Sequence, residues 1–239
     1  MRFCLAGSFV CSLFLGKTQS FEEIRSRLAN LYDSSTFVCD STGFSKLPNV
    51  NYFCSKGNEV EGNFYHVTDL NNDGLNDLIY NGPCMPYSQT AIFLNNGKTL
   101  NMIYDQAGTL QKITRTKNGT FVDILLESIA CLEDNSITRL VIGKKGLVAD
   151  NTISFHHTTT ISTGQLKQIN VGGTLRTTPA IDNADRVSNC IDEIVKGNQV
   201  MQLKNNSVVT ELARQGAWSL VLYSLNKHSS LIGWIKTGN

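Results

Sequence analysis

The sequence predicts a mainly β protein, mostly antiparallel, with one helix near its N-terminus. From Ser35 onward, short runs of β-favouring residues alternate with turns rich in Asn, Gly and Lys. The chain has 239 residues and is 41% hydrophobic, which is enough for one large core or two modest ones. Only 17% of the residues are charged, and the net charge is +1 with no basic stripe. The composition therefore indicates neither disorder nor a nucleic-acid partner.

The first twenty residues are typical of a secretory signal. Arg2 precedes an apolar run over residues 3–16, which is too short to cross a bilayer. Thr18 and Ser20 supply small side chains before a cleavage point, so we expect cleavage after Ser20. The alternative is a buried first strand, because a short apolar run can belong to either. Cleavage would leave 19 basic and 20 acidic residues in a periplasmic or secreted protein without a membrane span.

Residues 21–35 are expected to form the helix. Their apolar positions Phe21, Ile24, Leu28 and Leu31 recur at helical spacing. Two glutamates stand in the first turn, where the helix dipole favours negative charge.

The alternation of β-favouring runs and turns continues to about residue 164 and predicts a first domain over residues 21–164. The expected strands lie within residues 63–70, 77–82, 90–94, 120–128, 138–146 and 152–161. A second small β domain is expected over residues 165–239, which contain both tryptophans.

An internal repeat lies inside the first domain. Aligning its two halves matches Gly74 with Gly119, Asp77 with Asp123, and Gly97 with Gly146. The matched residues are separated by 45, 46 and 49 positions, and a period of this size is typical of repeated β units. The alternative is chance, because β-rich chains often align with themselves.

Cysteine usage indicates disulfides and no zinc site. Two of the seven cysteines leave with the signal, and no C-x-x-C pair remains. Cys84 and Cys131 match approximately in the repeat, so we expect them to pair. Cys39 and Cys54 would then close a short loop and Cys190 would be free, although spacing alone does not fix the connectivity.

The stretch from Asp69 to Asp77 has the spacing D-x-N-x-D-G-x-x-D. Hard cations prefer carboxylate, amide and carbonyl oxygens, and alternate positions of a tight loop direct such oxygens inward. Gly74 permits the sharp turn that this requires. The pattern is not an EF-hand, because Tyr80 stands at the twelfth position, where that motif has glutamate.

These residues and their β-favouring flanks resemble the calcium loop of FG-GAP (integrin-type) and VCBS repeats, closely over the loop and weakly over residues 60–150. The resemblance implies a propeller-blade-like antiparallel domain that binds Ca²⁺. Its ligands would be the side chains of Asp69, Asn71, Asp73 and Asp77 and the carbonyl of Leu75. The second repeat has Arg115 and Lys117 where acids are expected, so it should not bind calcium.

Two other interpretations of this loop remain open. A metal-free turn held by Asx hydrogen bonds would use the same residue types. Paired carboxylates can also perform acid–base catalysis, but no second cluster in the sequence points to a substrate. We therefore favour a structural metal over an active site.

The C-terminal segment resembles a bacterial SH3-like (SH3b) domain. The match is carried by Gly216, Trp218, Val221, Gly233, Trp234 and Ile235, and upstream by Arg176, Pro179 and Gly197. It implies a small β-barrel that binds peptides or cell-wall fragments on an aromatic groove, with Trp218, Tyr223 and Trp234 as candidate ligand-binding residues. The alternative is that the tryptophans are core residues. A long loop that carries Cys190 departs from the family pattern.

Together these features predict an exported, non-catalytic binding protein of a bacterial envelope. Its partner would be a protein, for example an envelope-attacking toxin that it neutralises as an immunity protein, or a peptidoglycan fragment. The alternative is a cell-wall hydrolase with an SH3b targeting domain. No G-x-S-x-G is present, and His156 and His157 would lie on opposite faces of a strand, so we name no catalytic residue.

Overall fold

The structure, a computed structural model, describes Leu47 and residues 64–84, 87–117, 119–127, 135–156, 166–187 and 194–238. These residues form fourteen β-strands and no α-helix, so the mainly β class is confirmed. The expected signal and the helix expected over residues 21–35 lie outside the described residues. Within the described ranges, no helix is long and apolar enough to cross a membrane.

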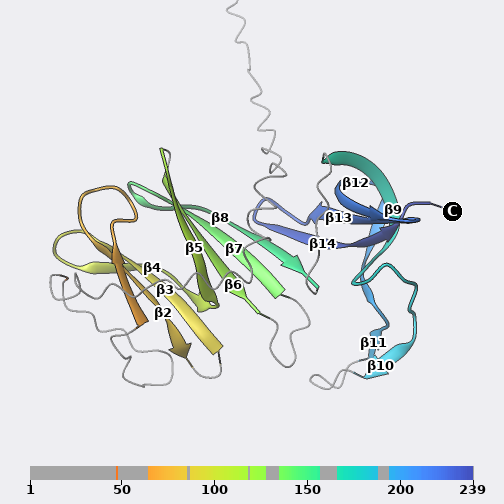
Figure 1. Cartoon of the computed structure of the whole chain (residues 1–239), viewed down its shortest axis with the longest axis horizontal. Coiled ribbons are helices and arrows are strands. Elements are labelled where there is room, and N and C mark those ends of the chain that lie inside the picture. Colours follow the sequence, from red (N-terminus) through yellow and green to blue (C-terminus); the bar gives the residue numbers. More distant parts are fainter. Residues whose placement is uncertain are drawn as a thin grey trace, which may run out of the picture.

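The first four strands form an antiparallel sheet in which each strand pairs with the next (Figure 1). They are β1 (Tyr65–Thr68), β2 (Asp77–Cys84), β3 (Tyr87–Asn95) and β4 (Leu100–Ala107). Alternating side chains serve two cores. Ile79 and Ile92 face the second half of the repeat, whereas Leu78 and Tyr80 pack on the opposite face with Phe93.

The next four strands form a second antiparallel meander. They are β5 (Thr109–Thr116), β6 (Gly119–Leu126), β7 (Asn135–Gly143) and β8 (Gly146–Phe155). The two meanders correspond to the two halves of the internal repeat. Gly97 and Gly146 both lie at the last turn of their meander, with φ of +85° and +122°, a region that favours glycine.

The two meanders pack face to face around one apolar cluster. It consists of Leu70, Ile79, Ile92 and Leu94 on one side and Leu110, Val122, Ile124, Leu140 and Ile142 on the other. Each such fully buried side chain contributes roughly 1.5–3 kcal/mol relative to exposure.

The C-terminal unit is built from four strands whose pairing closes on itself. They are β9 (Lys167–Arg176), β12 (Gln199–Gln215), β13 (Trp218–Ser224) and β14 (Ser229–Lys236). They pair in the order β9–β12–β13–β14, and Trp234 of β14 meets Arg176 of β9. Register shifts in β12 between Leu203 and Ser207 are consistent with bulges that bend this long strand. A separate hairpin is formed by β10 (Asp185–Val187) and β11 (Ile194–Lys196).

The units on either side of residue 164 share one eight-stranded sheet. β14 pairs in parallel with β8, from Ser229 opposite Thr152 to Ile232 opposite Phe155. An apolar cluster spans this junction, with Leu125, Ile137, Ile153 and Phe155 from the first unit and Leu212, Leu220, Leu222 and Ile232 from the second. The two predicted domains are therefore continuous through both backbone and core.

Candidate functional site

The loop between β1 and β2 is closed by hydrogen bonds from its own backbone. The Asp69 carboxylate accepts from the N–H of Asp73 at 3.2 Å and of Gly74 at 3.0 Å. Asn71 Oδ1 accepts from the N–H of Asp73 at 3.0 Å, and Asp73 Oδ1 from that of Leu75 at 2.8 Å. These are the side-chain-to-backbone bonds of Asx turns.

Asp77 lies at the start of β2 and is fully buried. Its Oδ2 accepts a hydrogen bond from the N–H of Leu70 at 2.7 Å, and its Oδ1 from that of Asn95 at 2.8 Å. The pKa of Asp77 is raised to about 6, chiefly by burial; the two backbone hydrogen bonds oppose the increase, and the charges of Asp73 and Asp69 add to it. Asp77 thus ties the start of the loop to the end of β3.

The donor atoms of the loop are of the kind that calcium prefers. All the expected ligands are oxygens, and each carboxylate oxygen has a lone pair beyond the one used by a backbone N–H. Within the described residues, however, no three His, Cys, Asp or Glu side chains gather as a metal-holding group. Both interpretations of the loop therefore stay open, and calcium remains a prediction.

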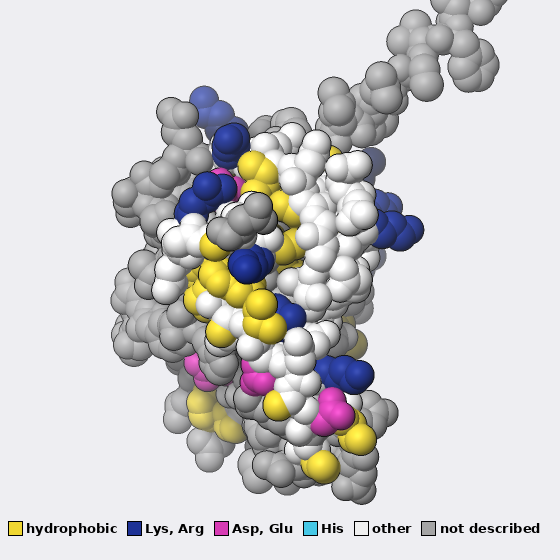
Figure 2. Space-filling model, turned by 90° about the vertical axis from the view of Figure 1, so that its right-hand side faces the viewer, with side chains coloured by type: hydrophobic (Ala, Val, Ile, Leu, Met, Phe, Trp, Pro, Cys, Tyr) yellow, Lys and Arg dark blue, Asp and Glu magenta, His cyan; other side chains and the backbone are white. Residues whose placement is uncertain are grey.

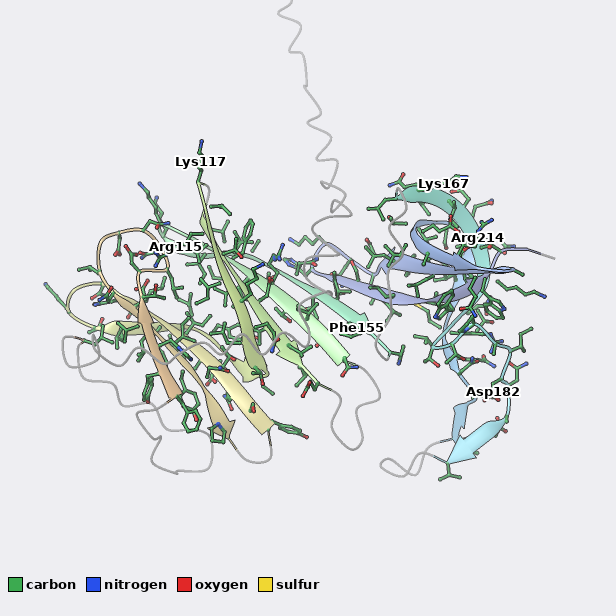
Figure 3. All side chains as sticks on the ribbon, viewed as in Figure 1. Arg115, Lys117, Phe155, Lys167, Asp182 and Arg214 are labelled. Carbon is green, nitrogen blue, oxygen red and sulfur yellow. The ribbon has the colours of Figure 1, made fainter. Side chains whose placement is uncertain are left out.

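Arg115 joins this loop to the other half of the repeat. From β5 it donates through Nη2 to Thr68 Oγ1 at 2.5 Å and to the Asp69 carbonyl at 3.2 Å, and Figure 3 labels it beside the loop. The sequence matched Arg115 to an acidic position of the calcium pattern. In the structure it is a positively charged neighbour of the first loop.

Trp218 lines a small groove on the C-terminal unit. The groove has a volume of about 140 Å³, and Trp218 is half-buried there. Its lining residues are Gly172, Gly173, Thr174, Arg176, Ile181, Trp218, Ile235 and Lys236. Of the three aromatic residues predicted to bind a ligand, only Trp218 lies in this groove.

The other two aromatic residues pack elsewhere. Trp234 stands opposite Leu220 on the outer face of β13 and β14 and packs against the cluster that joins the two units. Tyr223 stands opposite Leu231 and packs against the internal cluster of the C-terminal unit. Because positions 220 and 223 lie on opposite faces of β13, the three predicted residues do not form one aromatic groove.

Arg176, which the sequence indicated only as part of the SH3b resemblance, lines this groove. Arg176 is buried and donates through Nη1 to the Asp182 carbonyl at 3.0 Å and to Asn198 Oδ1 at 2.8 Å. Its Nη2 donates to Asn183 Oδ1 at 3.0 Å. The pair Gly172-Gly173 inside a β run was the available signal, since glycine within a strand often marks a bulge or a close approach.

The predicted disulfide residues are only partly described. Cys84 is buried and disulfide-bonded. It is the one cysteine within the described ranges, so its partner lies outside them. Cys39, Cys54, Cys131 and Cys190 also lie outside, and the predicted pairing stays open.

No family model, curated protein or solved structure matches this chain. The resemblances to FG-GAP, VCBS and SH3-like domains therefore stay predictions.

Proposed function

We propose that this chain is an exported, non-catalytic binding protein that recognises a protein partner through the groove beside Trp218. The observation that carries the proposal is the position of Trp218, half-buried in a groove on the C-terminal unit. A tryptophan in such a place offers a large rigid apolar surface at low conformational cost, and binding energy often concentrates in such anchors.

The floor of the groove is open to an approaching chain. A Cβ added at Gly173 would meet nothing within 4 Å, so space is open on that side of the strand. Gly172 in contrast lies against Asn205, where an added Cβ would come within 2.5 Å of Asn205 Oδ1. Ile181, which is 62% exposed, extends the apolar surface beside the groove.

Charge favours a partner with acidic groups. Residues 165–239 contain eight Lys and Arg against five Asp and Glu, a net charge of +3. Figure 2 shows the end of the molecule formed by this unit, where hydrophobic side chains gather near the centre and Lys and Arg side chains lie around them. An apolar residue flanked by carboxylates would suit this surface, because charge complementarity raises the rate and specificity of association.

The strand arrangement supports the same proposal. The closed pairing of β9, β12, β13 and β14 is consistent with a small barrel of the SH3-like kind. The signal-like leader supports a partner in the bacterial envelope, such as an envelope-attacking toxin. Calcium, if bound between β1 and β2, would act as a structural ion of the first unit.

The test begins with the mature protein as an affinity bait in envelope extracts. A captured protein is purified, and its Kd is measured by calorimetry with the unaltered protein and with Trp218→Ala. We expect Trp218→Ala to weaken binding by about 2 kcal/mol, or roughly 30-fold. Lys236→Glu should also weaken binding, and more at low salt than at high salt, because it replaces one of the two positive charges that line the groove with a negative one.

Tyr87→Ala is the matched control, since Tyr87 is also a partly exposed aromatic residue but lies on β3 of the first unit. Its affinity should equal that of the unaltered protein. Full affinity in Trp218→Ala, in a protein that remains folded by circular dichroism, would contradict the proposed site.

A further inference from the structure

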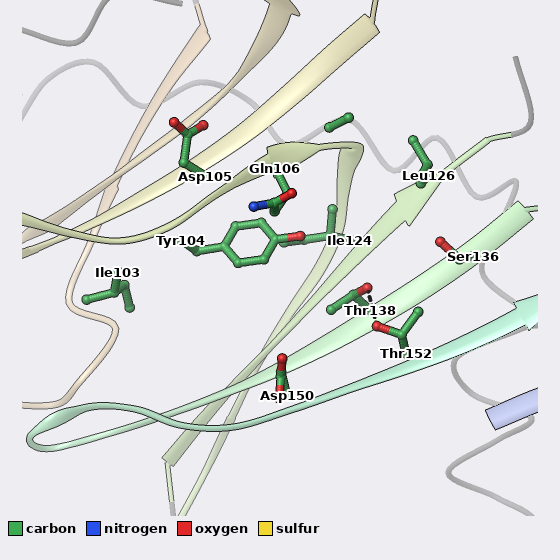
Figure 4. A pocket seen from close by; sticks show the side chains of 11 residues that line it. Ile103, Tyr104, Asp105, Gln106, Ile124, Leu126, Ser136, Thr138, Asp150 and Thr152 are labelled. Carbon is green, nitrogen blue, oxygen red and sulfur yellow. Dashed lines mark hydrogen bonds between the residues drawn. The ribbon is translucent and has the colours of Figure 1, made fainter. Parts of the chain in front are cut away.

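A second and larger cleft lies between the two meanders of the first unit. It has a volume of about 500 Å³, within the range of small-molecule sites. β4 forms one wall and β6, β7 and β8 form the other (Figure 4). Its lining residues are Ile103, Tyr104, Asp105, Gln106, Ala107, Ile124, Leu126, Ser136, Thr138, Asp150 and Thr152.

Strand registers show which side chains enter this cleft. Ile124 faces the first sheet as part of the core between the meanders, and Thr138 stands opposite it on β7. Thr152 stands opposite Thr138 on β8, so both threonines face the first sheet as Ile124 does. On β4, Tyr104 is opposite Ile92, another member of that core, and therefore faces the threonines.

Asp105 is different, because its side chain points away from the cleft. It stands opposite Ala91, which packs on the other face of the first sheet, and it accepts a hydrogen bond from Gln89. Figure 4 shows this carboxylate directed away from Tyr104 and the threonines. The charged group directed into the cleft is therefore Asp150.

Polar residues here replace the apolar ones that a packed pair of sheets would require. Along β7, Leu140 and Ile142 lie in the core between the meanders, whereas Thr138 and Ser136 continue the same face with hydroxyl groups. Along β8, Asp150 and Thr152 occupy the same face. A local departure from the apolar pattern of a core is expected at a functional site.

The polar groups of the cleft are mostly neutral hydrogen-bonding groups. The hydroxyls of Thr138 and Thr152 lie 2.9 Å apart, and either can donate to the other. Asp150 lies beside His228, with its Oδ1 2.8 Å from Nδ1 of the imidazole. Burial, with the charges of Asp150 and Asp105, raises the pKa of Tyr104 to about 12, so its hydroxyl is protonated at neutral pH.

We propose that this cleft binds a neutral polyhydroxylated ligand of the size of a mono- or disaccharide. Tyr104 would supply a ring face and a hydroxyl, and Thr138, Thr152 and Ser136 would supply hydroxyls that both donate and accept. Asp150, beside His228, would accept from a ligand hydroxyl. This site lies in the other unit from Trp218 and does not rest on the proposed function.

The experiment is saturation-transfer difference NMR on the full mature protein. The probes are glucose, N-acetylglucosamine, maltose and cellobiose, with putrescine as a cationic and acetate as an anionic comparison. For any probe whose signal saturates with concentration, the affinity is then measured by titration with the variants Tyr104→Phe and Thr138→Val. Each variant removes one hydroxyl with little change in volume. Thr210→Val is the matched control, since Thr210 is a half-buried strand threonine on β12 outside the cleft.

We expect at least one saccharide to saturate the signal, and each cleft variant to weaken its binding about 3- to 10-fold, as the loss of one hydrogen bond implies. Thr210→Val should bind as the unaltered protein does. The proposal is overturned if no saccharide saturates, if putrescine or acetate binds more tightly than every saccharide, or if both cleft variants bind normally while folded.

Discussion

Asp123 and Arg139 form a buried ion pair across strands β6 and β7. Arg139 donates from Nε to Oδ1 and from Nη2 to Oδ2 of Asp123, each at 2.7 Å. The guanidinium carbon also lies 5.2 Å from the centre of the Phe121 ring. The sequence repeat matched Asp123 with Asp77, but their roles differ, because Asp77 accepts from backbone N–H groups and Asp123 from a guanidinium.

Breaking this pair should destabilise the protein more than removing it altogether. Arg139→Met leaves the Asp123 carboxylate buried without its cation, which should lower the free energy of unfolding by about 3–5 kcal/mol. The double variant Asp123→Leu with Arg139→Met should recover most of that loss. Urea unfolding followed by circular dichroism measures all three proteins, and a single variant as stable as the original would contradict the expectation.

The calcium prediction can be separated from the metal-free turn by removing charge from the loop. Asn in place of Asp69 and Asp73 keeps one of the two acceptor oxygens at each position and removes two negative charges from the proposed ligand set. If calcium binds, the unaltered protein should gain about 2.7 kcal/mol at a free calcium concentration 100 times its Kd. The double variant should lose this gain while its stability in EDTA changes little.

Thermal unfolding in EDTA and in excess calcium measures this response. The protein must first be analysed for tightly held metal, so that a slow-leaving ion is not overlooked. Equal melting temperatures in both conditions, from protein shown to have carried no ion, would leave the Asx turn as the sole explanation of the loop.

Truncation of the two tryptophans should lower the free energy of unfolding by different amounts. Trp234 packs against the cluster that joins the units, so Trp234→Ala should lower the free energy of unfolding by about 2–3 kcal/mol. Trp218 lines the surface groove, and Trp218→Ala should cost less than about 1 kcal/mol. Chemical unfolding distinguishes them, and equal losses would show that Trp218 is also a core residue.

The strands of the first unit could be predicted because their signals are local. Short runs of β-favouring residues around Ile79, Ile92 and Val122 predict strands, and the structure has β2, β3 and β6 there. Gly97 and Gly146 mark the closing turns of the two meanders in both sequence and structure. Tyr223 and Trp234, by contrast, were grouped by residue type, although strand alternation separates them.

The long-range pairings could not be predicted because no local pattern specifies them. The parallel pairing of β14 with β8 depends on where Ser229 meets Thr152, which the spacing within each strand does not contain. The cleft depends likewise on how far the two sheets diverge at Tyr104 and Thr138. Thr138 lies in a strand predicted from the sequence, whereas Tyr104 lies outside the predicted runs, and no motif marks either residue.

Phe155 provides the sharpest test of whether the two units unfold together. It lies at the end of β8, 2% exposed, within the apolar cluster that also contains Leu220 and Ile232 (Figure 3). Phe155→Ala should cost about 3–5 kcal/mol, because it removes a ring from a packed junction.

Both tryptophans lie in the second unit, so their fluorescence reports that unit, while far-UV circular dichroism reports the whole chain. If the junction couples the units, both probes should show one coincident transition that shifts equally in Phe155→Ala. Leu225→Ala, at a 49% exposed position, is the control and should shift neither. An unchanged fluorescence midpoint in Phe155→Ala would mean that the second unit folds independently of the first.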